Sequence, residues 1–191
     1  MAQILLTFVL SAWFAIFAAA APLQFRLLDV HGGVHTAAEW SGRKAIVLFF
    51  VVQDCPVGNS YVPEMNRIEQ TYSPRGVRFY AVQADVSAAA AVTAEYARDY
   101  RFVFPLLLDS SQVLVRLAGA TVTPQAVILS PGGEVLYRGR IDNRVEDFGS
   151  QRPEATVHDL RDALDAVLAG HQPRVRFTRS IGCAITRLPQ K

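Results

Sequence analysis

The two cysteines of the sequence are the side chains best suited to covalent chemistry. Cys55 follows the uninterrupted apolar run of residues 45–52 after Gln53 and Asp54, and it precedes a segment with helical periodicity. A thiol at the amino end of a helix faces unpaired N–H groups and the positive end of the helix dipole, which lower its pKa. The neighbouring carboxylate of Asp54 acts in the opposite direction. The position predicts a nucleophile for disulfide exchange or peroxide reduction, with an inert buried cysteine as the alternative.

The second cysteine, Cys183, lies near the other end of the chain in a segment without helical periodicity. It directly follows Gly182, a residue type that permits unusual backbone angles. Because the chain has only two cysteines, we expect a reversible disulfide between Cys55 and Cys183. Cys183 is then either the resolving thiol of a redox pair or half of a structural bridge, and closing that loop stabilises the fold by about 4–5 kcal/mol.

Strand and helix patterns alternate around Cys55. Residues 45–52 show no polar alternation, which is typical of a strand buried on both faces. The helix after Cys55 contains Pro63 and carries its apolar residues on one face: Val57, Tyr61, Met65, Ile68 and Tyr72. A hairpin around Gly32-Gly33 precedes this unit, and strands are predicted at 77–84, 104–108, 125–129 and 135–141. Strands that alternate with helices predict an α/β fold with a mixed central sheet and helices on both faces.

Three further helices are predicted after this unit. The first covers residues 87–100, with Val92, Tyr96 and Tyr100 in line. The second covers residues 110–118, with Ser110 or Ser111 as N-cap and Gly119 as its end. The third begins with a capping-box pattern at residues 156–159, includes Val157 on its apolar face and ends at Gly170. A polar loop is expected at residues 142–154.

The first residues of the chain form a targeting segment. Residues 1–21 carry no charged side chain and end in four alanines. This pattern is typical of an export signal cleaved after Ala20, or of a retained membrane anchor. Both place the rest of the chain outside the cytoplasm, as a periplasmic or secreted protein in which disulfides persist. The predicted organisation is a signal or anchor at 1–21, one domain at 22–170 and a tail at 171–191.

Composition excludes several classes of protein. The chain has 191 residues, of which 51% are hydrophobic, and 19 basic against 17 acidic side chains give a net charge of +2. This favours one packed core over disorder, and the scattered arginines argue against a nucleic-acid partner. Two cysteines are too few for a zinc or multi-disulfide scaffold, and the four histidines show no metal-ligand spacing. We expect no metal and no other cofactor.

The sequence F-F-V-V-Q-D-C-P-V-G, with Pro63 eight residues after Cys55, resembles the active-site segment of the thioredoxin superfamily. Val122-Thr123-Pro124-Gln125 resembles the superfamily's cis-proline site, and the intervening strand and helix resemble its redoxin branch, the alkyl hydroperoxide reductase C/thiol-specific antioxidant-like proteins. The resemblance implies a three-layer thioredoxin-like sandwich over residues 23–170. It also implies that Thr123 and Pro124 shape a groove for an extended substrate beside Cys55.

The sequence departs from this family at the active-site segment. Gly58 stands where the C-x-x-C motif has its second cysteine, and Val52 and Leu48 replace the threonine and proline of the peroxiredoxin pattern. We therefore expect a thiol–disulfide oxidoreductase with Cys55 as nucleophile. A thiol peroxidase and a non-catalytic binding module with a structural disulfide are the alternatives.

Several other residues are candidates for roles beside the thiol. Pro56 and Asn59 are candidate substrate contacts, with helix capping or solvation as the alternative for Asn59. Arg140, Asp142 and Arg144 are expected on the rim of the site or simply in solvent. The expected partners are a thiol or disulfide protein or a small thiol reductant, with a hydroperoxide as a further candidate.

Overall fold

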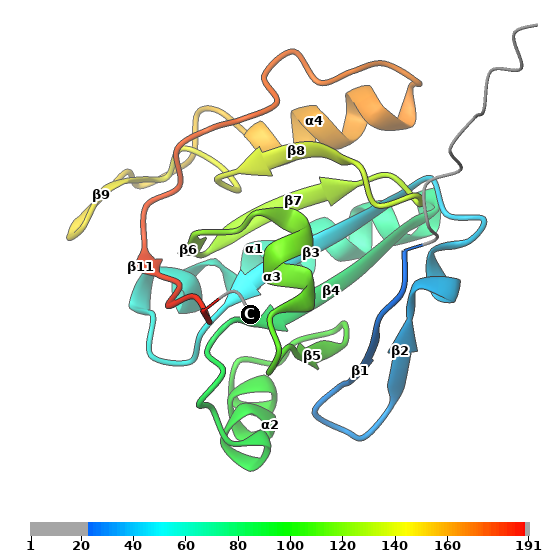
Figure 1. The fold of residues 1–191 in the computed structure, drawn as a ribbon. Coiled ribbons are helices and arrows are strands. Elements are labelled where there is room, and N and C mark those ends of the chain that lie inside the picture. The colour runs from blue at the N-terminus through cyan, green and yellow to red at the C-terminus, as the bar shows by residue number, and fades with distance from the viewer. Residues whose placement is uncertain (1–22, 190–191) are drawn as a thin grey trace, which may run out of the picture.

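The computed structural model describes residues 23–189, so the predicted signal or anchor at 1–21 lies outside the described residues. The helices are α1 (Pro56–Tyr72), α2 (Ala90–Asp99), α3 (Val113–Ala118) and α4 (Asp159–Leu168), with short 3-10 turns at Ala37–Trp40 and Ser73–Arg75. The strands are β1 (Arg26–Leu28), β2 (Val34–Thr36), β3 (Ala45–Val51), β4 (Val77–Gln83), β5 (Leu106–Leu108), β6 (Val122–Thr123), β7 (Gln125–Leu129), β8 (Val135–Gly139), β9 (Val145–Asp147), β10 (Ser150–Gln151) and β11 (Cys183–Ala184). Figure 1 shows their arrangement.

A five-stranded mixed sheet in the order β5-β4-β3-β7-β8 forms the centre of the protein. β3 pairs in parallel with β4 and antiparallel with β7, while β8 returns antiparallel to β7. Every residue of β3 is buried, because helices or loops cover both faces of the sheet at its centre. This confirms the predicted central strand and the α/β thioredoxin-like fold, and it places Cys55 at the carboxyl end of the middle strand.

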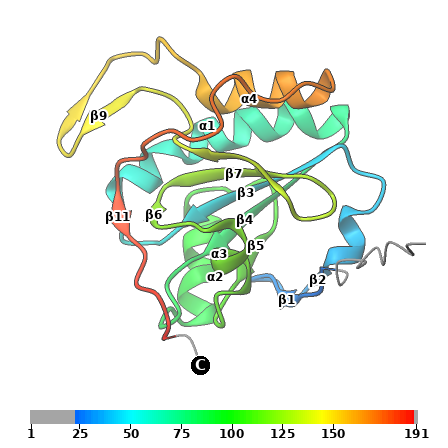
Figure 2. The same cartoon turned by 45° about the horizontal axis from the view of Figure 1, so that its top comes forward.

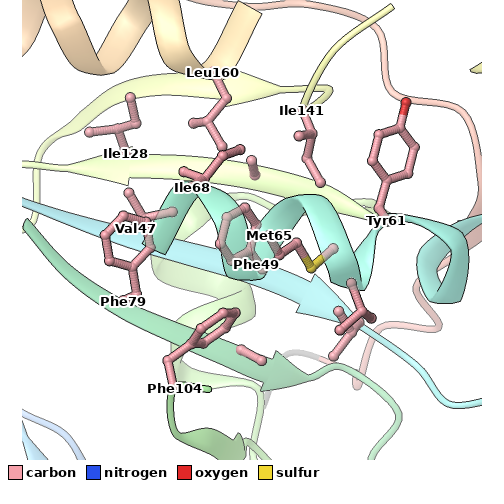
Figure 3. Close-up of a cluster of buried hydrophobic side chains, with 14 of the residues drawn as sticks. Val47, Phe49, Tyr61, Met65, Ile68, Phe79, Phe104, Ile128, Ile141 and Leu160 are labelled. Atoms are coloured by element: carbon pink, nitrogen blue, oxygen red, sulfur yellow. The ribbon is translucent and has the colours of Figure 1, made fainter. Parts of the chain in front are cut away.

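Side chains of β3 alternate between two hydrophobic cores. One core contains Val47 and Phe49 with the buried faces of α1 and α4, and the other contains Ile46, Leu48 and Phe50 with α3 and the β1–β2 hairpin. Figure 2 shows α1 and α4 on one side of the sheet and α3 on the other. Figure 3 shows Phe49 of the first core between α1, β4 and the segment before β5. The two cores fix the strand that carries the thiol from both sides.

The structure corrects four details of the predicted helices and loops. α2 buries Thr93, Tyr96 and Ala97, while Val92 and Tyr100 are exposed, because the helix starts later and is rotated relative to the predicted apolar line. The amino end of α3 is capped by the Asp109 carboxylate, which accepts N–H bonds from Val113, Leu114 and Val115, instead of by Ser110 or Ser111.

The other two corrections concern the region before the last helix. α4 begins at Asp159, so Val157 lies outside it and is exposed. The N-cap residue is His158, and its side chain makes no capping hydrogen bond. The predicted polar loop contains the short β9–β10 hairpin, which projects away from the sheet. Within residues 23–189, no helix is both long and apolar enough to span a membrane.

Candidate active site

Cys55 joins the end of β3 to the beginning of α1. It has an extended backbone (φ −96°, ψ 100°) and is the N-cap residue of the helix, with Pro56 in the first turn. Its sulfur accepts a hydrogen bond from the Gly58 N–H (Sγ–N 3.4 Å), and its carbonyl accepts the first helical bond from the Asn59 N–H (2.9 Å). The cysteine sulfur therefore occupies the place of an oxygen in an ordinary helix cap, facing free N–H groups.

The Thr123–Pro124 segment lies opposite this helix end. The peptide bond between these residues is cis, as the resemblance implies. The Cys55 thiol donates to the Thr123 carbonyl oxygen over 3.0 Å, so β6 and the helix end are in direct contact. A Cβ built on Gly58 would lie 3.6 Å from the Cys55 sulfur and 3.9 Å from Cδ of Pro124. A side chain at position 58 would thus face the Cys55 thiol, but the residue there is glycine, so α1 supplies no second thiol at this position.

Cys183 approaches Cys55 from the other side. It lies in β11, which pairs antiparallel with β6, Cys183 opposite Thr123. Both cysteines are free, and each side chain lies close enough to shift the pKa of the other. The structure therefore brings the only two cysteines together, across a long stretch of sequence, as reduced neighbours.

The surroundings of the two thiols make them unequal. Burial raises the pKa of Cys55, but the neighbouring Cys183 side chain, the Gly58 amide and the Thr123 side chain outweigh it, and the net pKa is lowered. Burial and the adjacent Cys55 sulfur raise the pKa of Cys183 to about 11. Asp54 is exposed and is not among the groups that shift the Cys55 pKa. Cys55 is accordingly the stronger candidate for the thiolate, with Cys183 as its proton-bearing partner.

The other predicted contacts are placed differently around the thiol. Pro56 is exposed, and Asn59 donates from its side-chain amide to the Gln53 carbonyl oxygen (2.8 Å), which holds the segment before Cys55. Both residues line an open depression outside the helix end, together with Gln53, Asp54, Ser60 and Tyr100. Thr123 is fully buried, because β11 covers the groove that the resemblance implies.

The polar residues expected on the rim do not face the thiols. Asp142 is buried and accepts a 2.6 Å bond from the Tyr61 hydroxyl, while the Arg144 guanidinium stacks over the Tyr61 ring. Arg140 pairs with Asp159 at the start of α4. These groups fasten the segment after β8 to α1 and α4, so their role here is structural.

Gln112, which sequence reasoning did not single out, and Gly182, whose reason it did not predict, hold the tail over the site. Gln112 is buried with positive φ (54°), and its side-chain amide binds the backbone at both Thr186 and Leu188. Gly182 lies against Thr123 so closely that any side chain there would overlap the Thr123 carbonyl oxygen. The glycine before Cys183 was visible in the sequence, but the reason for it is close approach of two backbones, which only the fold reveals.

Comparison with known proteins identifies the family. Residues 18–138 match the AhpC/TSA family, and the chain belongs to it. Members of this family carry out thiol-based redox chemistry, and oxidoreductase activity is the general function that the site and the family share. No curated protein matches the sequence significantly.

Solved structures support the same fold. An uncharacterized conserved protein of Geobacillus kaustophilus is 25% identical, with a TM-score of 0.73, over 93% of this chain and 96% of that one. A hypothetical protein of Sinorhizobium meliloti 1021 is 26% identical, with a TM-score of 0.70, over 86% and 91%. Peroxidoxin BcpB of Mycobacterium tuberculosis is 16% identical, with a TM-score of 0.56, over 78% and 94%. The last likeness is one of fold alone.

Proposed function

We propose that this protein is an exported thiol–disulfide oxidoreductase in which Cys55 is the nucleophile and Cys183 the resolving thiol. The observation that carries the proposal is the meeting of two free cysteines at the amino end of α1: Cys55 bonds the Thr123 carbonyl oxygen, Cys183 lies opposite Thr123 on β11, and the pKa is lowered for Cys55 and raised for Cys183. A purely structural bridge needs no such difference between its two sulfurs. A nucleophile and its resolving partner benefit from it, because the thiolate form attacks.

The reaction has two balanced steps. The Cys55 thiolate attacks one sulfur of a substrate disulfide, forms a mixed disulfide and releases the other substrate sulfur as a thiolate. The Cys183 sulfur then attacks Cys55, its proton passes to the departing second substrate sulfur, and a Cys55–Cys183 disulfide remains. The substrate gains two electrons and the protein loses two. An external dithiol protein or small thiol reductant returns the pair to the reduced state.

Export of the chain belongs to the same proposal. The apolar segment at 1–21, which ends in small residues, supports delivery outside the cytoplasm. In that compartment a reversible disulfide has oxidised and reduced partners available. Export is tested separately from the chemistry by fusing residues 1–21 to a reporter. The amount of reporter delivered outside the cytoplasm should exceed that of the reporter alone.

The chemistry is tested with dithiodipyridine and three forms of the full chain: the parent, Cys55→Ser and Cys183→Ser. We expect the parent to release two thiopyridones and to end, by mass spectrometry, as an internal disulfide without an adduct. Cys183→Ser should release one thiopyridone and keep the adduct on Cys55, while Cys55→Ser reacts much more slowly than the parent. A parent chain that ends with an adduct on each cysteine would contradict the proposal.

Replacing the disulfide with hydrogen peroxide distinguishes a thiol peroxidase from a thiol–disulfide oxidoreductase by the rate of sulfenate formation at Cys55. For an oxidoreductase specialised in disulfide exchange, Cys55 forms a sulfenate no faster than a free cysteine does. Faster formation would assign the same pair of thiols to peroxide reduction instead.

A further inference from the structure

We propose that the outer edge of β6 accepts a strand in which glycine precedes cysteine. The chain's own tail occupies this edge in the resting state, and a partner protein with the same Gly-Cys pattern in an extended segment replaces it during the reaction. This inference rests on the proposed function and specifies which disulfide partners reach Cys55.

The C-terminal tail closes the site over Cys55. Cys55 is completely buried, and the strand above it is β11, which pairs with β6 at Cys183 and Ala184. Ile185 extends this pairing with an N–H bond to the Thr121 carbonyl oxygen (3.0 Å). Figures 1 and 2 show the tail passing along β8 and then beside β6. A protein disulfide therefore reaches Cys55 only after residues 182–185 have left β6.

The edge of β6 excludes a side chain at the position of Gly182. A Cβ added to Gly182 would overlap the Thr123 carbonyl oxygen and lie 2.7 Å from the Thr123 carbonyl carbon and 3.0 Å from Cδ of Pro124. The first two are backbone atoms of a buried strand, so they cannot move aside as a flexible side chain would. Any strand that presents a cysteine to Cys55 in this register meets the same atoms. Steric exclusion of this kind produces specificity for glycine.

The two residues after the cysteine differ in what they require of a replacing strand. Ala184 is exposed, so its position places no demand on a replacing strand. Ile185 is buried and packs in the core that contains α3, so an aliphatic side chain is favoured there. The complete pattern is glycine, cysteine, any residue and an aliphatic residue. Strand addition to an exposed sheet edge gives affinity through the main chain and specificity through such alternate positions.

The tail is held on both sides of β11 and only weakly at β11 itself, which permits exchange. Before the site, Thr178 is tied to β8 by its N–H bond to the Arg138 carbonyl oxygen (3.2 Å) and its side-chain bond to Tyr137 (2.8 Å). After the site, the Gln112 amide accepts from the Leu188 N–H and donates to the Thr186 carbonyl oxygen, and Arg187 donates to the Ala120 carbonyl oxygen. Between these fastenings β11 has only two paired residues, so a short local opening frees β6.

The experiment uses the full chain with Cys183→Ser, in which Cys55 is the only thiol. The probes are two peptides, Ile-Gly-Cys-Ala-Ile and Ile-Ala-Cys-Ala-Ile, each carrying its cysteine as a mixed disulfide with thiopyridine. The Cys55 thiolate attacks the peptide sulfur, a peptide–Cys55 disulfide forms and thiopyridone leaves, and its absorbance gives the rate. Reduced glutathione, reacted with the same probes, corrects for any intrinsic difference between the peptides.

We expect Cys55 to react at least about tenfold faster with the Gly-Cys peptide than with the Ala-Cys peptide, because a clash with fixed backbone atoms excludes the latter from the same register. Adding Arg187→Ala, an exposed position whose side chain fastens the tail, should raise both rates and leave their ratio unchanged. Equal corrected rates for the two peptides would overturn the inference.

Failure of the proposed function would look different. In that case Cys55 would react no faster than glutathione with either peptide, both before and after Arg187→Ala. A fast reaction with both peptides at equal rates would retain the oxidoreductase and reject the Gly-Cys preference alone.

Discussion

Gly182→Ala is the substitution whose effect the structure defines most sharply. The new methyl group overlaps the Thr123 carbonyl oxygen, so either β6 shifts or β11 leaves it. Forcing an extra methyl group into a packed position costs about 1–3 kcal/mol. The cost cannot exceed the free energy of lifting β11, whose main contributions are burial of Ile185, about 1.5–3 kcal/mol, and the hydrogen bonds at Gln112. We therefore expect local opening to become about 5–150-fold more frequent.

The assay is the alkylation rate of Cys55 in a Cys183→Ser background, at one pH and with excess reagent. Because Cys55 is completely buried, alkylation requires the open form, and its rate should rise by the same factor. Gly132→Ala is the matched control: its Cβ would meet only the Ser130 hydroxyl at 3.7 Å, so its alkylation rate should equal that of the background. A Gly182→Ala protein with unchanged alkylation would refute the claim that β11 covers the thiol.

Three further predictions test other parts of the account. Because the pKa of Cys183 is raised to about 11, the folded protein holds a proton that the unfolded chain loses above about pH 9. The free energy of unfolding of the reduced protein should therefore fall as pH rises from about 9 to about 11. Urea titrations should show a steeper fall for the parent than for Cys183→Ser. Tyr61→Phe removes the bond to buried Asp142 and should cost about 1–3 kcal/mol in urea unfolding, while equal Cys55 alkylation rates in parent and variant would confirm that this pair lies apart from the thiols. Phe49→Ala empties the core beside α1 and should cost about 3–5 kcal/mol by the same method, and a loss below about 1 kcal/mol would contradict the packing in Figure 3.

The sequence predicts the parts of the fold that local patterns determine. An apolar run without alternation identifies β3, the spacing from Val57 to Tyr72 identifies the buried face of α1, and the order of elements identifies the mixed sheet. The placement of Cys55 follows from these two elements, and we predict it as the nucleophile because a residue between a buried strand and a helix start faces the helix dipole. The AhpC/TSA family match confirms the redoxin family that the sequence resembles.

Contacts between distant segments could not be predicted in the same way. The tail has no periodicity, and its placement on β6 depends on the close approach of Gly182, one buried aliphatic side chain and the Gln112 amide, and no local pattern pairs these residues with β6. The cap of α3 is a second example. Asp109 accepts three backbone hydrogen bonds from the first turn of α3 because the chain turns sharply at Gln112, and a prediction that considers only a serine near the helix start does not find this cap. Where contacts with residues distant in sequence fix the placement of a segment, the local sequence pattern does not predict it.

The proposal of a reversible Cys55–Cys183 pair is tested most directly by redox titration of the full chain. The protein is equilibrated in buffers of graded thiol and disulfide content, quenched by alkylation and mapped by mass spectrometry. We expect one disulfide, between Cys55 and Cys183, that forms and disappears reversibly at a potential above about −300 mV. Two free thiols in the most oxidising buffer, or a bridge that persists well below that potential, would contradict the proposal.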